Sequence, residues 1–456
     1  MSSLRGRIRI VVVGAGFAGF HCLRQLERIL PPEAAEIVVV SPTDYMPYLP
    51  LLPEVGAGIV DPRHIAVPLS VVLSRTRLVP GHAVGVDFTA RACEVQDPEG
   101  SRRSLHWDRL VLVPGSVTRT LPIPGLVEHA VGFKTIAEAL YLRDHLLEQL
   151  ELADTGDDLA TRQARCTFVV VGAGYTGTEL AAQGQLFTQA ARRHYPHIGP
   201  DELRWVLVDL APTIMPELGE RLSRPALRIL RGRGVDVRLR TTVEEVTAGA
   251  VRLSDGTIVP TRTLVWCVGV TPGPLTQVLG LHTEKGRIVV DPYLTVPGRP
   301  DVFAAGDAAG APDPSRPGGL TPMTAQHAQR QGKVAARNLA ASLGFGTRKA
   351  YRHRDLGFVV DLGGWQAVAN PLRVPLSGVP AKVITRGYHL WSLPHNRLRV
   401  ASDWVNDVVE HRQFVRLGLV SGPEARLPVA EQMDLYYRSD GSRLEDRAPA
   451  EAVPTR

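Results

Sequence analysis

A glycine-rich turn of the form GxGxxG occurs twice in this chain, and this repeat constrains the fold more than any other feature. The first copy lies in IVVVGAGFAG and the second in FVVVGAGYTG. In such a turn the first glycine allows a tight bend, the second lets the backbone approach a pyrophosphate, and the third lets helix and strand pack closely. The six glycines are Gly14, Gly16 and Gly19 in the first copy and Gly172, Gly174 and Gly177 in the second.

The residues around each turn predict a strand, a helix and a second strand. Residues 8–13 and 37–40 are apolar runs rich in β-branched residues, typical of strands buried on both faces, and a helical stretch at 18–30 joins them. The same succession recurs from 168–171 to 205–209. Because a helix that begins at such a turn offers free N–H groups to phosphate, we predict two dinucleotide sites. The predicted fold class is α/β, with two Rossmann-like dinucleotide-binding domains.

The second unit carries an acidic residue at the end of its second strand. Asp209, in WVLVDLAP, can accept hydrogen bonds from the ribose 2′-OH and repel a 2′-phosphate, which favours NADH over NADPH. A solvated loop aspartate is the alternative. The first unit has Ser41 at the corresponding position, and we expect Ser41 or Asp44 to contact the ribose there.

A further strand–glycine junction, DVFAAGDAAG, favours a flavin in the first unit. The carboxylate of Asp307, after the turn at Gly306, can bond the ribityl hydroxyls of a flavin, and the alternative is an ordinary turn aspartate. We therefore assign FAD to the first unit and NADH to the second. The segment that follows predicts a helix with Thr321 as its N-cap and Gly344 as its stop.

This order of units predicts a divided first domain. We expect an FAD-binding domain of residues 1–125 and 285–345 and an NADH-binding domain of residues 126–284. A C-terminal α+β region of residues 346–437 follows, with segments that are candidates for contact with a membrane interface. The last residues, 438–456, are polar and are predicted to be disordered.

Composition argues against several classes of function. The formal charge is +6, but no basic run alternates with aromatic residues as a nucleic-acid groove requires. The four cysteines form no CxxC pair, which argues against a metal site or a dithiol centre and suits a reducing compartment. No apolar stretch of about 18 residues is present, so we expect no spanning helix and a cytoplasmic protein.

Taken together, these motifs resemble those of the type II NADH dehydrogenases, single-chain flavoproteins of the two-dinucleotide-binding-domain superfamily. The resemblance covers roughly residues 8–420. It rests on VVVGAGFAG, YLPLLPEVGAG, LVLVPGSVT, GFKTIAEALYLRDHL, VVVGAGYTGTELA, DVFAAGDAAG and TAQHAQRQGK. It implies an enzyme that passes two electrons from NADH through FAD to a membrane quinone without pumping protons.

The resemblance also implies catalytic roles for Glu179 and Gln326. Glu179 matches a family glutamate close to the flavin and nicotinamide rings, where it could order a water or relay a proton. A second family glutamate, four positions later, is Gln183 here, which puts a paired-carboxylate relay in doubt. Ala325 and Gln326 match an AQ pair whose helix N-terminus faces the flavin and stabilises negative charge on it.

Four more positions complete the expected site. Gly115, in LVLVPGSVT, is assigned to the FAD site, and Gly269, in LVWCVGV, to the NADH site. The family's second glutamine in the AQ helix falls at Arg330, which with His327 leaves the quinone site open. A lone histidine such as His327 is more often structural than catalytic.

Family members sit on the membrane through C-terminal amphipathic segments. Here residues 383–400 and 403–420 mix aromatic and aliphatic side chains with arginines, which suits either a membrane interface or a packed C-terminal domain. We therefore expect a cytoplasmic protein, peripheral on the cytoplasmic face of the cell membrane if these segments bind it. A homodimer is the expected assembly if the chain associates.

Other functions stay open at this level. A sulfide:quinone oxidoreductase or a disulfide reductase needs redox cysteines that this chain does not place together. A soluble NADH diaphorase with another electron acceptor, or a non-catalytic NAD(H)-sensing flavoprotein, fits the same glycine turns. Rapid reduction by NADH with sustained turnover on quinone distinguishes the quinone reductase from both.

Overall fold

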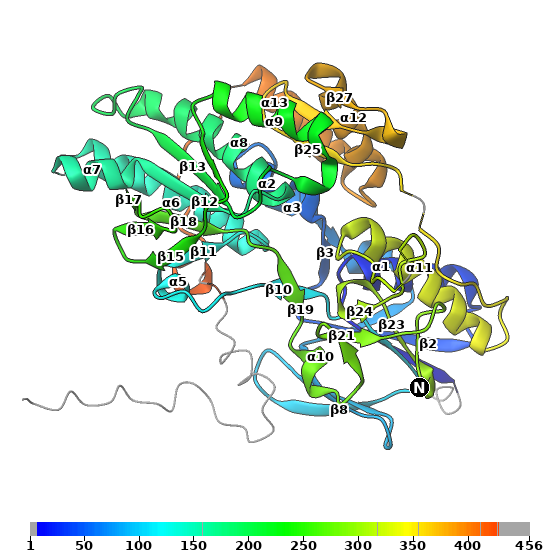
Figure 1. The fold of residues 1–456 in the computed structure, drawn as a ribbon. Helices are drawn as coiled ribbons and strands as arrows, with labels where there is room; N and C mark the ends of the chain where they lie inside the picture. Colours follow the sequence, from blue (N-terminus) through cyan, green and yellow to red (C-terminus); the bar gives the residue numbers. More distant parts are fainter. Residues whose placement is uncertain are drawn as a thin grey trace, which may run out of the picture.

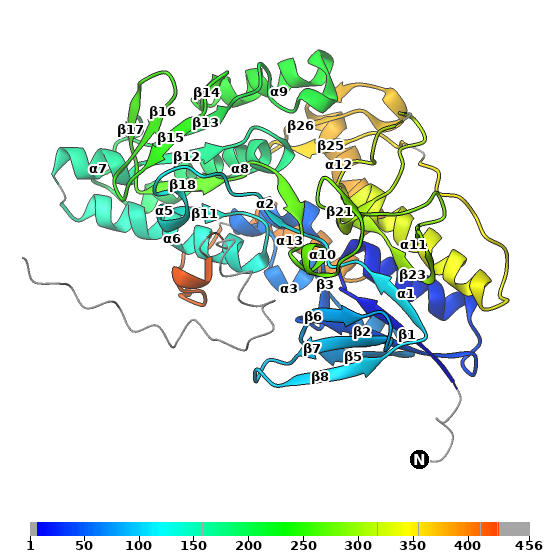
Figure 2. The ribbon, with the colours of Figure 1, turned by 60° about the horizontal axis from the view of Figure 1, so that its bottom comes forward.

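A computed structural model describes residues 7–156, 158–316, 318–353, 355–410, 412–425 and 427 of the 456-residue chain. The chain forms two parallel-stranded sheets at opposite ends of the molecule, with a C-terminal region packed between and above them (Figures 1 and 2). The predicted fold class, with two Rossmann-like units, is confirmed. The predicted disordered tail, residues 438–456, lies outside the described residues.

The first sheet contains the first glycine turn. Its strand order is β22-β23-β9-β1-β2-β5, and only the pair β22–β23 is antiparallel. The strands are β1 (Ile8–Val13), β2 (Ala35–Ser41), β5 (Thr76–Pro80), β9 (Arg109–Leu112), β22 (Thr295–Val296) and β23 (Arg299–Ala304). Because β1 lies between β2 and β9, the strand order reverses at β1, and the carboxyl ends of β1 and β9 flank a crevice.

The second sheet repeats this design around the second glycine turn. Its five strands, in the order β11-β18-β12-β13-β14, are all parallel. They are β11 (Ala130–Gly132), β12 (Thr167–Val171), β13 (Arg204–Asp209), β14 (Asp236–Leu239) and β18 (Thr263–Trp266). Here the strand order reverses between β12 and β18, at the equivalent place.

The repeat extends beyond the glycine turns. In each unit a three-stranded antiparallel sheet precedes the strand that returns beside the first one. These sheets contain β6 (His82–Asp87), β7 (Ala92–Gln96) and β8 (Arg102–His106), and β15 (Val243–Val246), β16 (Ala250–Leu253) and β17 (Ile258–Pro260). The chain passes between the two units along β10 (Ser116–Thr118) and back along β19 (Val270–Pro272), which pair antiparallel (Figure 1).

Helices cover both sheets. The glycine turns lead into α1 (Phe17–Ile29) and α8 (Tyr175–Ala191), and α1 packs along α11 (Ala325–Ser342). The other helices are α2 (Leu52–Gly56), α3 (Pro62–Ile65), α4 (Leu69–Val72), α5 (Leu126–His129), α6 (Ile136–Asp154), α7 (Leu159–Arg165), α9 (Glu220–Gly232) and α10 (Leu275–Val278). Short strands are β3 (Tyr45–Pro47), β4 (Ala66–Pro68), β20 (Thr283–Glu284), β21 (Arg287–Val289) and β24 (Ala309–Gly310).

The start of α11 differs from the prediction. Its N-cap is Thr324, whose side chain accepts a hydrogen bond from the backbone N–H of His327, and the helix ends at Ser342. Thr321 is not the cap because its hydroxyl accepts a hydrogen bond from Gln331 and its carbonyl one from Arg287. Thr324, three residues later, has the same hydroxyl group, so residue type alone does not distinguish the two threonines. The prediction of Thr321 was wrong.

The C-terminal region is a small antiparallel sheet with two helices. The strands are β25 (Val359–Asp361), β26 (Ala367–Ala369) and β27 (Leu376–Ser377), and the helices are α12 (Val379–Ser392) and α13 (Arg397–Val409). The chain after α13 then runs back to α6, where the N–H groups of Leu417 and Gly418 bond Asp144. The C-terminal region is therefore held against the NADH-side unit.

Candidate functional site

The two glycine turns close two crevices in the same way. Gly14 has φ +105° and Gly172 has φ +102°, which favour glycine. A Cβ on Gly14 would lie 2.3 Å from the carbonyl oxygen of Val113, and one on Gly172 would lie 2.4 Å from that of Cys267. Each turn is thus pressed against the loop that follows the neighbouring strand, β9 or β18.

The second glycine of each turn leaves open space for a ligand, and the third allows close packing of the backbone. Gly16 and Gly174 are the N-cap residues of α1 and α8, where no side chain caps the helix and a Cβ would meet nothing within 4 Å. Gly19 and Gly177 are packed instead, with a Cβ 1.9 Å and 1.8 Å from the carbonyl oxygens of Gly14 and Gly172. Uncapped amides beside open space are what a pyrophosphate requires, so both crevices fit a dinucleotide.

Gly115 and Gly269 also occupy equivalent places. Each follows the return strand of its unit, each has φ +76°, and a Cβ on either would meet nothing within 4 Å. Their carbonyl oxygens accept hydrogen bonds from Gly273 and Arg119, which lie at the crossing between the two units. The structure therefore brings both residues to the rims of their crevices, at the ends that face each other through β10 and β19.

Asp209 lies at the end of β13 with its carboxylate turned toward the glycine loop. One oxygen accepts the backbone N–H of Ala173 at 2.5 Å and the other accepts that of Ala211 at 2.7 Å. These bonds fix the charge beside the second crevice. In the first unit Ser41 is buried and its hydroxyl accepts the N–H of Thr43, while Asp44 is exposed. The first crevice therefore has no carboxylate at the position equivalent to Asp209.

The GD turn packs against the first crevice. Gly306 has φ +70°, and a Cβ there would lie 3.0 Å from the Cβ of Ala18, in the first turn of α1. The Asp307 carboxylate accepts a hydrogen bond from Ser116 at 2.6 Å, and Lys134 donates to the same hydroxyl at 2.9 Å. Burial lowers the pKa of Lys134, while Asp307 opposes that shift. The sequence prediction did not include Ser116 and Lys134 beside Asp307, although both lie inside the motifs that carried the resemblance.

The helix α11 begins at Ala325 and Gln326, and the amide of Gln326 is fixed in place. It donates to the carbonyl oxygen of Gly357 at 2.9 Å and accepts from Arg330 at 3.3 Å. His327 bonds the hydroxyl of Tyr351 at 2.8 Å, and burial lowers the pKa of His327 to about 4. Arg330 thus orients Gln326, and His327 belongs to the packing of this helix.

The segment from Gly357 to β25 joins α11 to α8. After the bond between Gln326 and Gly357, Phe358 stacks on Tyr175 of α8 with ring centroids 5.4 Å apart. Two residues into β25, the backbone N–H of Asp361 donates to Glu179 at 2.8 Å. The two predicted catalytic residues, Glu179 and Gln326, are therefore linked through one C-terminal segment.

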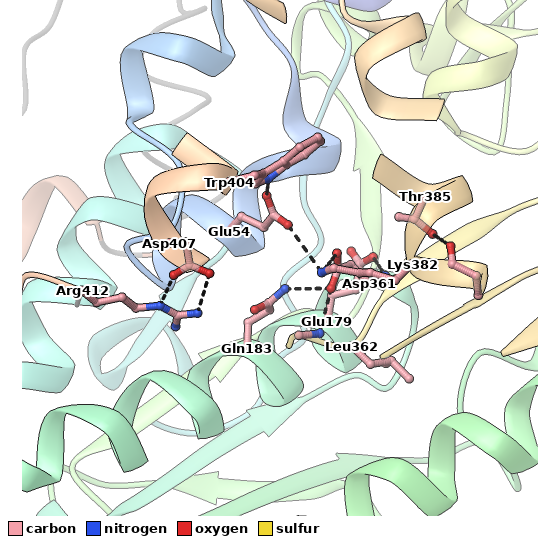
Figure 3. Close-up of polar contacts among 12 residues, drawn as sticks. Glu54, Glu179, Gln183, Asp361, Leu362, Lys382, Thr385, Trp404, Asp407 and Arg412 are labelled. Atoms are coloured by element: carbon pink, nitrogen blue, oxygen red, sulfur yellow. Dashed lines mark hydrogen bonds and ion pairs between the residues drawn. The ribbon is translucent and has the colours of Figure 1, made fainter. Parts of the chain in front are cut away.

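Glu179 is half-buried and interacts with three buried residues, and we call the group of Glu54, Glu179, Asp361 and Lys382 the acid–lysine cluster (Figure 3). Lys382 forms an ion pair with Asp361, and its Nζ lies 4.0 Å from Glu54. The second oxygen of Glu54 accepts a hydrogen bond from the indole N–H of Trp404 at 2.5 Å. Four elements, α2, α8, β25 and α12, thus supply one titratable residue each, three of them buried and Glu179 half-buried.

Gln183 stands where the resemblance expects a glutamate, and it contacts a carboxylate from another element. Its amide N–H donates to Asp361 at 3.1 Å, so a carboxylate from β25 stands beside the helix position that lacks one. The amide oxygen of Gln183 is buried and has no hydrogen-bond partner among the described residues. Asp361 and Glu54 thus add two carboxylates that interact with Glu179, and a relay through paired carboxylates stays a prediction.

Burial dominates the electrostatics of the cluster. It raises the pKa of Glu179 well above its ordinary value, and the charge of Asp361 adds to this effect. Burial and Asp361 also raise the pKa of Glu54 to about 7, while Lys382 and the Trp404 hydrogen bond oppose that shift. One ammonium cannot balance three carboxylates in a medium of low dielectric, so the cluster holds a proton near neutral pH.

The sequence prediction missed Glu54, Asp361 and Lys382. Glu54 lies within PLLPEVGAG, Asp361 interrupts an apolar strand, and Lys382 is one of only five lysines. A rare lysine in an otherwise apolar stretch was the available signal, since lysine is almost never fully buried without a partner.

The four cysteines are free thiols in this structure, and three of them are buried. Burial raises the pKa of the Cys22 and Cys93 thiols to about 12 each. Thiols with a raised pKa are poor nucleophiles, so they do not suit a dithiol redox centre.

Comparison with known proteins relates this geometry to a family. The model of the pyridine nucleotide-disulphide oxidoreductases matches residues 8–332. The chain is 30% identical over 400 residues to the type II NADH:quinone oxidoreductase Ndh of Mycobacterium tuberculosis, covering 84% of each chain. It is 29% identical over 413 residues to the demethylphylloquinone reductase NdbB of Synechocystis, covering 88% of this chain and 96% of the relative.

A solved structure shares the same fold. It is that of NDH2 from Plasmodium falciparum in complex with NADH, with a TM-score of 0.82 and 17% sequence identity. The match covers 90% of this chain and 100% of that one. The likeness thus includes the C-terminal region as well as the two units with glycine turns.

Proposed function

This chain belongs to the type II NADH:quinone oxidoreductases of the pyridine nucleotide-disulphide oxidoreductase family, and from that premise we propose how its residues serve the reaction. It is an FAD-dependent NADH dehydrogenase that reduces a quinone without pumping protons. FAD binds at the first crevice and NADH at the second. Bound FAD supplies a carrier that takes two electrons from NADH and yields them to the acceptor.

The pair of equivalent crevices carries this proposal. The uncapped N-terminus of α1, at Gly16, holds the pyrophosphate of FAD, and that of α8, at Gly174, holds the pyrophosphate of NADH. The fixed carboxylate of Asp209 accepts the ribose hydroxyls of NADH and repels the 2′-phosphate of NADPH. The first crevice, which has Ser41 at that position, does not discriminate in this way.

Residues around the first crevice orient the flavin. Asp307, held by Ser116, accepts the ribityl hydroxyls, and Gly115 leaves room beside them. The N-terminus of α11 at Ala325 would stabilise the negative charge that bound flavin gains on reduction, through its helix dipole and free amides. Gln326, fixed by Arg330 and the Gly357 carbonyl, keeps that edge in place.

Glu179 and the rest of the acid–lysine cluster deliver the proton that the reaction consumes. NADH, a quinone and one proton give NAD⁺ and a quinol, so the hydride supplies two electrons and one of the two protons that the quinol gains. The other proton comes from solvent. We assign its delivery to Glu179 and Lys382, because they lie at the meeting of the two units and the C-terminal region.

We propose that the enzyme sits on a membrane surface through α12 and α13. Their outward faces expose Trp391, Leu398 and Val409, with Arg399 beside Leu398 in the sequence. Such a mixture of apolar and basic side chains suits a lipid interface and brings the enzyme to a lipid-soluble acceptor. Among the described residues no helix is long and apolar enough to cross a membrane.

The remaining sequence predictions stay proposals of the same kind. We keep the FAD-binding domain at 1–125 and 285–345 and the NADH-binding domain at 126–284, since the paired strands β10 and β19 run near these borders. Attachment to the cytoplasmic face and a homodimer are the corresponding proposals for location and assembly. Flotation with vesicles and the mass in solution test them separately.

The test is a steady-state assay of the purified yellow protein. With a soluble quinone as acceptor, the rate of NADH oxidation should exceed the rate of NADPH oxidation and should continue for many turnovers. Turnover with a dye but not with quinone would instead identify an NADH diaphorase. Flavin reduction without turnover on any acceptor would identify a sensor.

A further inference from the structure

Glu54 occupies a particular place in the acid–lysine cluster. It lies in α2, its side chain is 3% exposed, and it faces Lys382 on one side and Trp404 on the other (Figure 3). The carboxylate of Asp361, in contrast, accepts hydrogen bonds on both oxygens. The donors are Lys382, Gln183 and the backbone N–H of Gly363. Asp361 is therefore the direct partner of the lysine, while one oxygen of Glu54 lies 4.0 Å from the ammonium and has no hydrogen bond among the described residues.

A groove of about 750 Å³ lies beside the loop that follows α2, the helix of Glu54. It is bounded by the loop after α2, by α3, α6 and α13, and by the chain after α13. The Glu54 carbonyl accepts the N–H groups of Ile59 and Val60, which line the groove. Asp403, next to Trp404, and Asp407 line its other wall. Direct neighbours of Glu54 and of its partner Trp404 therefore line the groove: Ile59 and Val60 through backbone hydrogen bonds, and Asp403 through the chain.

We propose that Glu54 is the group through which the acid–lysine cluster takes up a proton from this groove and passes it through Lys382 toward the quinone. This inference rests on the proposed function, because that reaction consumes one proton from solvent in each turnover. Glu54 acts through Lys382 and does not itself contact the quinone. The groove offers polar side chains of both charges along its lining, among them Asp61 with Arg63 and Asp407 with Arg412.

The surroundings of Glu54 suit this task. Lys382 and Arg386 of α12 and the indole of α13 favour its ionised form, while Asp361 of β25 and burial favour the protonated form. Glu179 of α8 is coupled to it by charge. The influences that raise the pKa of Glu54 outweigh those that lower it and bring it to about 7, where a carboxyl that faces Lys382 can gain and lose a proton, as a relay requires.

The test compares Glu54→Gln with Glu148→Gln, a matched change at an exposed glutamate that pairs with Arg416. Gln keeps an oxygen that accepts the Trp404 N–H but cannot carry a proton. After anaerobic reduction by NADH, we expect an unchanged bleaching rate in both variants. Reoxidation by a soluble quinone should slow by about tenfold or more in Glu54→Gln alone. The reoxidation rate of the wild type should depend on pH near 7, and this dependence should be absent in Glu54→Gln.

A second readout needs neither nucleotide nor quinone. Infrared difference spectra of the holoenzyme between about pH 6 and pH 8 should contain the C=O band of a titrating carboxyl, and Glu54→Gln should lack it. Trp404→Phe removes a donor to the ionised form, so the midpoint of the band should move to higher pH. Identical spectra of the wild type and Glu54→Gln, or unchanged reoxidation in Glu54→Gln, would overturn the proposal. If the wild type is not reoxidised by quinone, the proposed function fails while the spectra still decide the titration of Glu54.

Discussion

Replacing Asp361 by Asn should destabilise the protein through Lys382. The Lys382 side chain is 2% exposed, and Asp361 is its direct ion-pair partner. In the variant one oxygen can still accept from Gln183 and Gly363, but the new amide nitrogen faces the ammonium, donor against donor. The lysine then remains buried without its counter-charge, which is the costly way to break a buried pair.

The magnitude depends on Glu54. Removing one partner of a buried ion pair costs about 3–5 kcal/mol. Because Glu54 lies 4.0 Å from the ammonium, it can ionise and replace part of the lost charge, so we expect about 3 kcal/mol. An unfolding entropy of about 2 cal/mol/K per residue gives roughly 1 kcal/mol/K for 456 residues, hence a fall of about 3 °C in Tm if the chain unfolds as one unit.

Differential scanning calorimetry of four FAD-loaded proteins tests this reasoning: the wild type, Asp361→Asn, Glu54→Gln and the double variant. The double variant should lose at least about 1 kcal/mol more than the sum of the single changes, because neither of the two carboxylates paired with Lys382 is left. Asp236→Asn, which removes a partner of exposed Arg204, is the control and should cost less than about 1 kcal/mol. A Tm of Asp361→Asn equal to that of the wild type would refute the role given to the ion pair.

Three further outcomes follow from the same structure. Gly174→Ala should weaken NADH binding, measured by titration, while leaving Tm unchanged, whereas Gly177→Ala should lower Tm because its Cβ would lie 1.8 Å from a carbonyl oxygen. Asp209→Ala should raise the ratio of kcat/KM for NADPH to that for NADH by roughly tenfold or more, and an unchanged ratio would remove Asp209 from the choice of nucleotide. Since the folded-state pKa of Glu54 is raised from 4.5 to about 7, folding binds a proton there, and stability falls as pH rises through that window. In the wild type the free energy of unfolding should fall by on the order of 3 kcal/mol across this window, and in Glu54→Gln it should not. Denaturant unfolding measures both, and an equal change with pH in the two proteins would contradict this expectation.

The sequence was sufficient for the parts of the site that depend on backbone conformation. Gly14 and Gly172 must adopt positive φ, and Gly16 and Gly174 must leave helix N-termini open, so glycine spacing alone predicts these crevices. Asp209 was predictable for the same reason, because the end of a parallel strand fixes where its side chain points. Local rules determine these features within about 40 residues of chain.

The acid–lysine cluster could not be predicted in this way. Glu54, Asp361 and Lys382 come from separate elements, and no local pattern relates a short helix to a strand some 300 residues later. The motif gave Glu179 its place but not its partners, and Gln183 appeared to remove an acid that Asp361 in fact supplies. The prediction of Thr321 as helix N-cap was wrong for a similar reason, because Gln331 and Arg287, from elsewhere in the fold, bind that threonine and Thr324 caps the helix.

The central claim is that two equivalent crevices hold FAD and NADH and that electrons pass from one to the other and on to a quinone. Anaerobic double-mixing stopped flow at the flavin absorbance tests it most directly. We predict rapid bleaching with NADH, much slower bleaching with NADPH, and full return of the flavin colour within one turnover after a soluble quinone is added. Bleaching that no quinone reverses, or equal rates with both nucleotides, would contradict this account.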